Sequence, residues 1–446
     1  MRALALRATL FAGTGDLVPY YALYALLFAD HGFGPGQISL LLACWSVTAF
    51  LFEVPSGAWA DTVSRRGLLI LNGLLMAAGF AVWTVAPSYV GFALGFVLWG
   101  VAGSLRSGTF EALLYDELAA RGAARSYARM IGYTRTASES SAVLAILAAT
   151  PLYLWGGYEL VGWVSVGCAV LHTALAASLP AAPRSVSAAD VGELEETGAE
   201  SAATAVVAPG PRPVAAGPGA RPGGPDPSAP GMLSRYLLML RTGVAEAIRV
   251  RTVRHGVVLG ALLYGITAFD EYFGLVAGEA GAATAFVPVL VGVTVVGSLL
   301  GSLLAGRTEA LPARTLAWAL GVAGALFGVG AVVAGLAARW HAVYACTGLG
   351  FAAIAAAYGV VYNAAIVAEA RLQDAITGPA RATVMSVSGL LEELVSLAVF
   401  GFVALATLWL SVSSTIALLG VAILALGVLT PYWLPPRPAP DSAAET

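Results

Sequence analysis

The feature that most constrains this chain is a series of long apolar stretches separated by short polar turns. A helix needs about 20 mainly apolar residues to cross the roughly 30 Å hydrocarbon core of a bilayer. Gly and Pro inside such a stretch do not argue against a helix, because neighbouring helices can satisfy the freed backbone groups. The sequence predicts twelve spanning helices, at residues 8–29, 37–58, 67–86, 90–113, 131–155, 159–180, 253–277, 284–305, 312–337, 341–366, 382–407 and 411–434.

The composition agrees with lipid as the solvent and excludes several kinds of chemistry. Hydrophobic residues make up 59% of the chain and charged residues only 11%, whereas soluble domains are about 25% charged. Every basic residue is Arg, and both a Walker-type phosphate loop and a pyridoxal Schiff base need Lys. The three cysteines, Cys44, Cys168 and Cys346, have no metal or redox spacing. We therefore expect no enzyme activity, no metal, no cofactor and no nucleic-acid partner.

A break in the middle of the chain divides the predicted helices into two sets of six. Residues 181–231 hold no aromatic residue and are rich in Pro, Gly and Ala, which predicts a disordered linker. Residues 232–252 alternate Arg with apolar residues, which favours either an amphipathic helix on the membrane surface or an extension of the seventh span. The predicted domains are thus a bundle at 1–180, a bundle at 253–434 and a tail at 435–446.

The distribution of Arg predicts how the chain is oriented. If the N-terminus is cytoplasmic, twenty arginines fall in the tails, the linker and the cytoplasmic loops, and only Arg339 lies at an external end. Cytoplasmic loops carry an excess of basic residues. We expect a multi-pass protein of the bacterial inner membrane with both termini in the cytoplasm.

A motif lies between the second and third predicted spans. Gly57 is followed by Asp61, Arg65 and Arg66, and this spacing resembles the loop between the second and third helices of the major facilitator superfamily, G-x-x-x-D-R/K-x-G-[x]-R/K-R/K. Thr62 stands where the family has a basic residue. Residues 106–116 look like the fourth helix of bacterial members, and residues 381–383 look like the start of the eleventh.

The resemblance implies a fold and a conformational role for the motif. The fold is two pseudo-symmetric six-helix bundles, and in the family this loop latches the two halves in the outward-open state. Small residues such as Gly57 allow close helix packing, and Asp61 can accept hydrogen bonds from a helix N-terminus beginning near Arg381. Arg65 or Arg66 could pair with Asp116. A plain cytoplasmic basic loop would explain the arginines but not the acid.

Ionisable side chains at membrane depth are costly and therefore mark functional sites. Carboxyl groups at this depth favour the neutral, protonated form and can exchange protons. The predicted coupling or substrate residues are Asp16, Asp270, Glu271, Glu392 and Glu393. The first, fourth, seventh and tenth helices line the central cavity in the resembled family, so the predicted cavity residues are Tyr20, Tyr24, Arg106, Tyr264, Tyr358, Tyr362 and Asn363.

A second group of charges lies in the fourth and fifth spans. The group consists of Arg106, Glu111, Arg135 and Glu139. Arg135 and Glu139 have i, i+4 spacing, and Arg106 and Glu139 lie at similar depth. Two positive and two negative charges suggest a self-neutralising buried cluster. Such a cluster can serve function or can only fix packing.

The leading hypothesis is a monomeric secondary transporter similar to the drug- and metabolite-efflux members of the family, which exports a small organic molecule in exchange for protons. The proton motive force would be its energy source, and its partners would be the substrate and the lipid bilayer. The alternatives are uptake by proton symport, a receptor or assembly factor on the same fold, and an intramembrane enzyme or lipid-handling protein. We expect gating to depend mainly on the first half and proton coupling on the second.

Overall fold

The structure, a computed structural model, describes residues 1–181, 249–376 and 381–437, and within these ranges not the side chains of residues 54, 58, 61 and 381–383. The predicted linker, most of the predicted amphipathic segment and most of the predicted tail lie outside the described residues. The described residues form helices and no strands.

The first half of the chain crosses the membrane six times, and two of these passes are interrupted. The first pass is interrupted by a 3-10 turn, and the fourth is broken at Ser107 and Gly108. The elements are α1 (Arg2–Gly15), η1 (Pro19–Ala22), α2 (Tyr24–Asp30), α3 (Pro35–Thr62), α4 (Arg65–Val85), α5 (Tyr89–Arg106), α6 (Thr109–Ala120), η2 (Ala124–Ser126) and α7 (Tyr127–Ser178).

Helix α7 contains two passes rather than one. Its 52 residues would measure about 78 Å as one straight helix, more than twice the thickness of the bilayer core. Gly156 and Gly157 depart from helical geometry, and Gly157 has a φ of 61°, which glycine adopts without steric cost. The chain therefore reverses there, between the predicted spans 131–155 and 159–180.

The second half repeats the plan of the first. Its first pass is also interrupted by a 3-10 segment, at the position that η1 occupies in the first half. The elements are α10 (Arg251–Gly265), η3 (Ile266–Tyr272), α11 (Phe273–Glu279), η4 (Thr284–Phe286), α12 (Val287–Thr308), α13 (Ala313–Gly335), α14 (Val343–Ala375), α15 (Arg381–Ala406) and α16 (Val412–Trp433). Ten helical stretches of the described residues are long and apolar enough to span a bilayer, and with α7 crossing twice and the first pass included the fold is the predicted twelve-helix membrane bundle.

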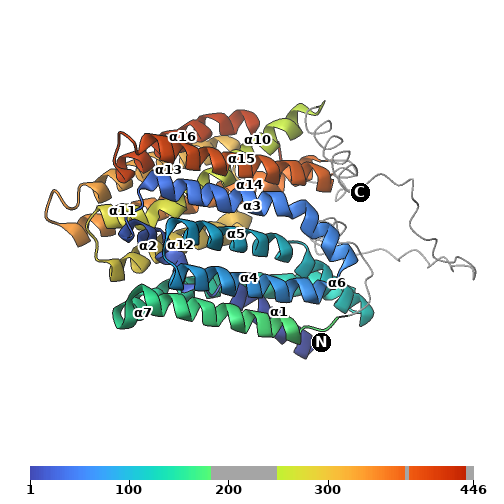
Figure 1. Cartoon of the computed structure of the whole chain (residues 1–446). Helices are drawn as coiled ribbons and strands as arrows, with labels where there is room; N and C mark the ends of the chain where they lie inside the picture. The colour runs from blue at the N-terminus through green and yellow to red at the C-terminus, as the bar shows by residue number, and fades with distance from the viewer. Residues whose placement is uncertain (182–248, 377–380, 438–446) are drawn as a thin grey trace, which may run out of the picture.

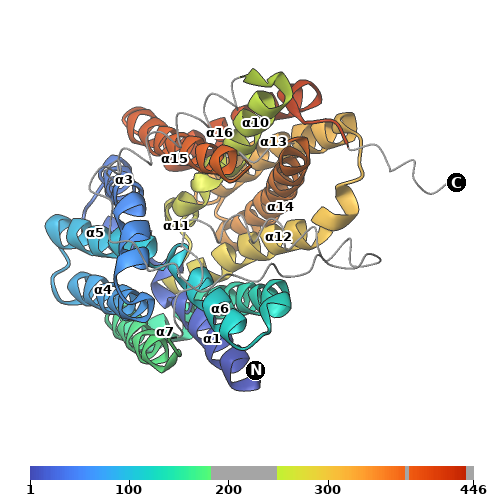
Figure 2. The same ribbon diagram turned by 90° about the vertical axis from the view of Figure 1, so that its right-hand side faces the viewer.

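The helices run side by side, and the start of α1 and the end of α16 lie at one end of the molecule (Figure 1). We call this the terminal end and the other the opposite end. Seen along the helices, α1 and α3–α7 form one group and α10–α16 another (Figure 2). The two groups pack together along two seams, α3 against α15 and α7 against α12.

Candidate functional site

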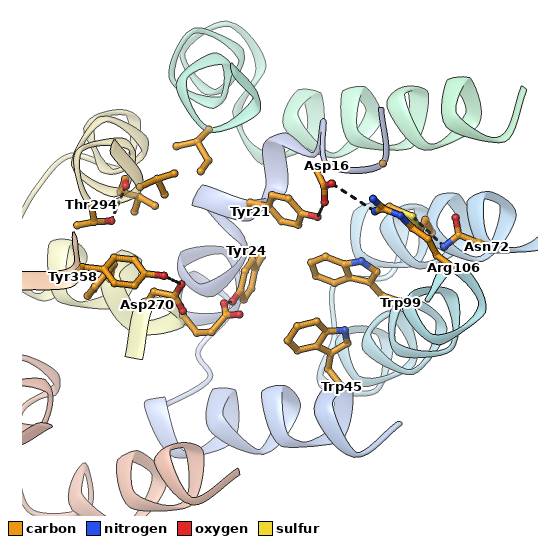
Figure 3. A pocket seen from close by; sticks show the side chains of 18 residues that line it. Asp16, Tyr21, Tyr24, Trp45, Asn72, Trp99, Arg106, Asp270, Thr294 and Tyr358 are labelled. Atoms are coloured by element: carbon orange, nitrogen blue, oxygen red, sulfur yellow. Dashed lines mark hydrogen bonds and ion pairs between the residues drawn. The ribbon is translucent and has the colours of Figure 1, made fainter. Parts of the chain in front are cut away.

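A cavity of about 360 Å³ lies at the centre of the molecule, between the two bundles. Its lining comes from both halves and includes the two interrupted passes, so the backbone irregularities lie where they face a cavity rather than lipid. Figure 3 shows Trp45, Trp99 and Arg106 on one side of this space and Asp270 and Tyr358 on the other.

The first half supplies an ion pair to the cavity. Asp16 follows the last residue of α1, and Arg106 ends α5, where a cation is favoured by the helix dipole. Arg106 Nη1 lies 3.5 Å from Asp16 Oδ2, and both side chains are partly exposed. The Asp16 carboxylate also accepts hydrogen bonds from Ser138 and from the hydroxyl of Tyr21. The charge of Arg106 is therefore balanced inside its own bundle.

Aromatic side chains form a flat wall beside this ion pair. Tyr21 stacks on Trp99 with ring centroids 5.5 Å apart and an interplanar angle of 18°. Trp45 lies 5.5 Å from Trp99. Flat aromatic walls offer dispersion contact to planar ligands and an attractive face to cations.

The second half supplies two consecutive carboxylates from η3. The hydroxyl of Tyr358 donates to Asp270 Oδ2 at 2.8 Å. Glu271 instead accepts from the hydroxyl of Tyr24, which belongs to the first half. Neighbouring residues of a 3-10 turn point in different directions, so one carboxylate is held within its own bundle and the other bonds across the interface.

Further contacts join the bundles at the level of the cavity and towards the opposite end. Ser39 and Tyr272 share a hydrogen bond of 2.7 Å between their hydroxyls, and Ser46 donates to Glu393. Leu26 packs so closely on Gly278 that a Cβ there would lie 2.6 Å from its Cδ2. The cavity is therefore closed towards the opposite end.

Gly57 lies on α3, in the terminal half of the same interface. No described atom lies within 4 Å of a Cβ built on Gly57. The close helix packing predicted for Gly57 is therefore not seen among the described residues, and the side chains at 381–383, where the predicted partner helix begins, lie outside them.

The remaining residues of the predicted latch are partly described. Arg65 is buried and donates to Asp116 Oδ2 at 2.6 Å and to the Ala60 carbonyl at 3.2 Å. Arg66 donates to the Leu179 carbonyl at 3.4 Å. The side chains of Asp61 and Arg381 lie outside the described residues.

Glu392 lines a second cavity, of about 280 Å³, between α10, α14 and α15. Tyr264 and Glu369 also line it, and the hydroxyl of Tyr264 donates to Glu369 Oε2 at 2.7 Å. Although Glu392 and Glu393 are adjacent in sequence, the first faces this cavity and the second bonds to Ser46 across the interface.

Four predicted cavity residues do not line the central cavity. Tyr264 lines the second cavity, and the ring centroid of Tyr362 lies 6.0 Å from that of Tyr264. Tyr20 is buried within the first bundle and bonds to Thr84 at 2.9 Å; the 3-10 turn changes the register after Asp16, so Tyr21 lines the cavity instead. Asn363 donates to the Gly301 carbonyl at 2.9 Å and accepts from Thr308 at 2.9 Å. It therefore joins α14 to α12, on the side away from the central cavity.

The predicted charge cluster forms only in part. Arg106, Glu111 and Arg135 line one small cavity of about 110 Å³, but the ion-pair partner of Arg106 is Asp16. Arg135 and Glu139 are exposed, and no ion pair joins them in the described structure.

Sequence reasoning missed two polar groups near the site. His172 is completely buried, with Nε2 2.9 Å from Asn72 Oδ1 and Nδ1 3.0 Å from the Phe11 carbonyl. Its position inside the predicted span 159–180 could have marked it as a polar group at membrane depth. Glu369 lies beyond the predicted span 341–366, whereas α14 continues to Ala375. Its spacing of seven residues from Tyr362 could have indicated a shared helix face.

Comparisons with known proteins give a consistent result. Two uncharacterized MFS-type transporters of Mycobacterium tuberculosis, from strains CDC 1551 and H37Rv, are each 28% identical over 164 residues, which is 37% of this chain and 38% of each relative. The crystal structure of the nucleoside transporter NupG shares the fold with a TM-score of 0.63 at 12% identity, over 96% of this chain and 98% of that chain. The family description Major Facilitator Superfamily matches residues 6–391, and the chain therefore belongs to the Major Facilitator Superfamily of membrane transporters.

Proposed function

We propose that this protein is a monomeric secondary transporter of the bacterial inner membrane that exports a small organic molecule in exchange for protons. The observation that supports this most is the central cavity, which is lined by acids of both bundles and closed at one end. Substrate sites of this fold lie between the two halves near the membrane midplane.

The Arg distribution supports assigning the terminal end to the cytoplasm. The closed opposite end is then external, and this conformation faces inwards. Its cavity is placed to receive cargo from the cytoplasm. Export requires the contacts between Tyr24 and Glu271, Ser39 and Tyr272, and Ser46 and Glu393 to break as the cavity turns outwards.

Coupling to protons is supported by the partners of Asp270 and Glu271. Each accepts a hydrogen bond from a neutral tyrosine, so each can take up a proton without leaving a cation unpaired. A protonated carboxyl and a carboxylate bound to a cationic cargo are both neutral overall. Proton and cargo can therefore compete for one acid, which is the requirement for exchange.

The shape of the cavity supports an organic cargo with a flat apolar part. Trp45, Trp99 and Tyr21 provide aromatic surface, and Asp270 and Glu271 provide negative charge. The proposal therefore favours planar aromatic cations among small organic molecules.

The test uses the full chain reconstituted in liposomes with a pH-sensitive dye inside and a panel of cationic, neutral and anionic organic compounds outside. Antiport predicts that adding a transported compound dissipates an imposed pH gradient. Asp270→Asn and Glu271→Gln should remove this response, whereas Glu309→Gln, at an exposed position between α12 and α13, should keep it. Proton movement in the same direction as the compound would establish uptake by symport instead. Compound transport that ignores the pH gradient in every case would refute proton coupling.

A further inference from the structure

Two carboxylates of the second bundle lie at different depths and are held in the same way. Asp270 in the central cavity accepts a hydrogen bond from Tyr358 at 2.8 Å (Figure 3). Glu369 in the second cavity accepts one from Tyr264 at 2.7 Å. Each acid therefore has a phenolic hydroxyl as its partner.

Tyr362 fills the space between these two pairs. Its ring centroid lies 6.0 Å from that of Tyr358 and 6.0 Å from that of Tyr264, and both contacts are edge-to-face, at 86° and 84°. Tyr358, Tyr362 and Glu369 are spaced by four and seven residues on α14, so they share one helix face. The series covers 11 residues, or roughly 16 Å along the helix axis.

We propose that Tyr358, Tyr362 and Tyr264 form a proton path that connects Asp270 with Glu369 and the second cavity. The path rests on the proposed proton coupling and adds a route to it. Asp270 and Tyr358 line the central cavity, whereas Tyr362, Tyr264 and Glu369 do not, so Asp270 can exchange its proton with the terminal end while cargo occupies the cavity.

The transfer balances without any change in the tyrosines. A proton from water of the terminal end binds a carboxylate oxygen of Glu369, and the neighbouring hydroxyl oxygen then accepts it and releases its own proton to the next oxygen. Hydroxyl hydrogens rotate to suit their partners, and water bridges hydroxyls that do not touch. At the end Glu369 is a carboxylate again, Asp270 carries one proton, and each tyrosine is neutral.

The surroundings of the path are acidic or phenolic. Glu392 of α15 shares the second cavity with Glu369, and Glu271 follows Asp270 on η3. The charge of Glu139 on α7 interacts electrostatically with the hydroxyl of Tyr362. None of the described residues that line the second cavity is cationic. Every side chain on this path therefore carries an oxygen that can accept a proton.

The test follows the protonation of Asp270 directly and needs no cargo. Full-length protein in liposomes is subjected to a rapid pH drop, and the carboxyl C=O band of Asp270, assigned by its loss in Asp270→Asn, is followed by time-resolved infrared spectroscopy. Tyr362→Phe and Tyr264→Phe keep the rings and remove the hydroxyls. Both should slow the appearance of this band about tenfold, the effect of losing roughly one hydrogen bond. Tyr344→Phe, at an exposed tyrosine of α14, is the matched control and should match the wild type.

The outcomes separate the path from the function on which it rests. If the band appears at the wild-type rate in both tyrosine variants, Asp270 is protonated directly from the central cavity and the path is wrong. If only the final size of the band changes and not its rate, the tyrosines only set the hydrogen bonding of the acid, and the path is again wrong. If no band of Asp270 changes with pH in the wild type, this acid does not couple protons, and the proposed function loses its support as well.

Discussion

The crossing of α12 and α14 provides the most direct test of the packing. The two helices touch through their backbones, because a Cβ built on Gly301 would lie 2.8 Å from the carbonyl carbon of Gly359 and 2.9 Å from its Cα. Carbon atoms at optimal contact are about 3.5–4.0 Å apart. Gly301→Ala would therefore force the helices apart by at least about 0.7 Å, and no flexible side chain is available to move instead.

The expected change in stability of Gly301→Ala is the sum of two opposing effects. Overpacking costs about 1–3 kcal/mol, whereas replacing Gly by Ala inside a helix gains about 0.5–1 kcal/mol. Gly306 lies on the same helix, and no described atom is within 4 Å of a Cβ built there, so Gly306→Ala keeps only the gain. For a bundle of this size each kcal/mol shifts the melting temperature by about 2–4 °C.

Thermal unfolding of the purified protein in detergent, followed by tryptophan fluorescence, measures the difference. We expect Gly301→Ala to melt several degrees below the wild type and Gly306→Ala to melt at or slightly above it. Equal melting temperatures for the two variants would refute the close crossing and with it the arrangement of α12 against α14.

Three further changes test other parts of the structure. Asp116→Leu should lower the free energy of unfolding by about 3 kcal/mol because it removes the buried partner of Arg65, and Arg65→Leu combined with it should recover most of the loss; thermal unfolding that ranks the single and double variants equally would contradict this. Asp61→Asn should slow transport while cargo affinity stays unchanged, as a latch requires, and an unaltered rate would remove that role. Gly278→Leu should open the interface at Leu26 and make the cavity accessible to a water-soluble thiol reagent from the opposite end, and unchanged labelling of an introduced cysteine there would argue against closure at this point.

The spans could be predicted from the sequence because their signal is strong and local. A run of about 20 apolar residues has few alternatives to a membrane helix. The interruptions could not be located in the same way, since Pro19 and Gly157 occur among many other Pro and Gly residues that leave their helices intact. Pro55 and Pro151, for example, lie inside α3 and α7.

The candidate site was predictable by residue type and less so by position. Asp16, Tyr24, Arg106, Asp270, Glu271 and Tyr358 reach the central cavity. Tyr20 does not, because helical spacing cannot be extended through a 3-10 turn, where each residue advances by a larger angle. Partners on other helices, such as Ser46 for Glu393, depend on tertiary packing, of which the sequence carries no local sign.

The partners of the acids give a physical reason to locate coupling in the second half. Asp16 lies beside Arg106, so a proton on Asp16 would leave a cation at membrane depth without its counter-ion, which is costly. Asp270 and Glu271 accept hydrogen bonds from uncharged Tyr358 and Tyr24 instead, and their protonation leaves no charge behind. We infer that the first half contributes a fixed ion pair and the movable contact at Tyr24, while the second half contributes the acids that change charge. Tyr24 bonds to Glu271 across the interface. In the proposed exchange, protonation of Glu271 would change a contact that has to break when the cavity turns outwards, and this would link the charge of the second half to the conformation of both.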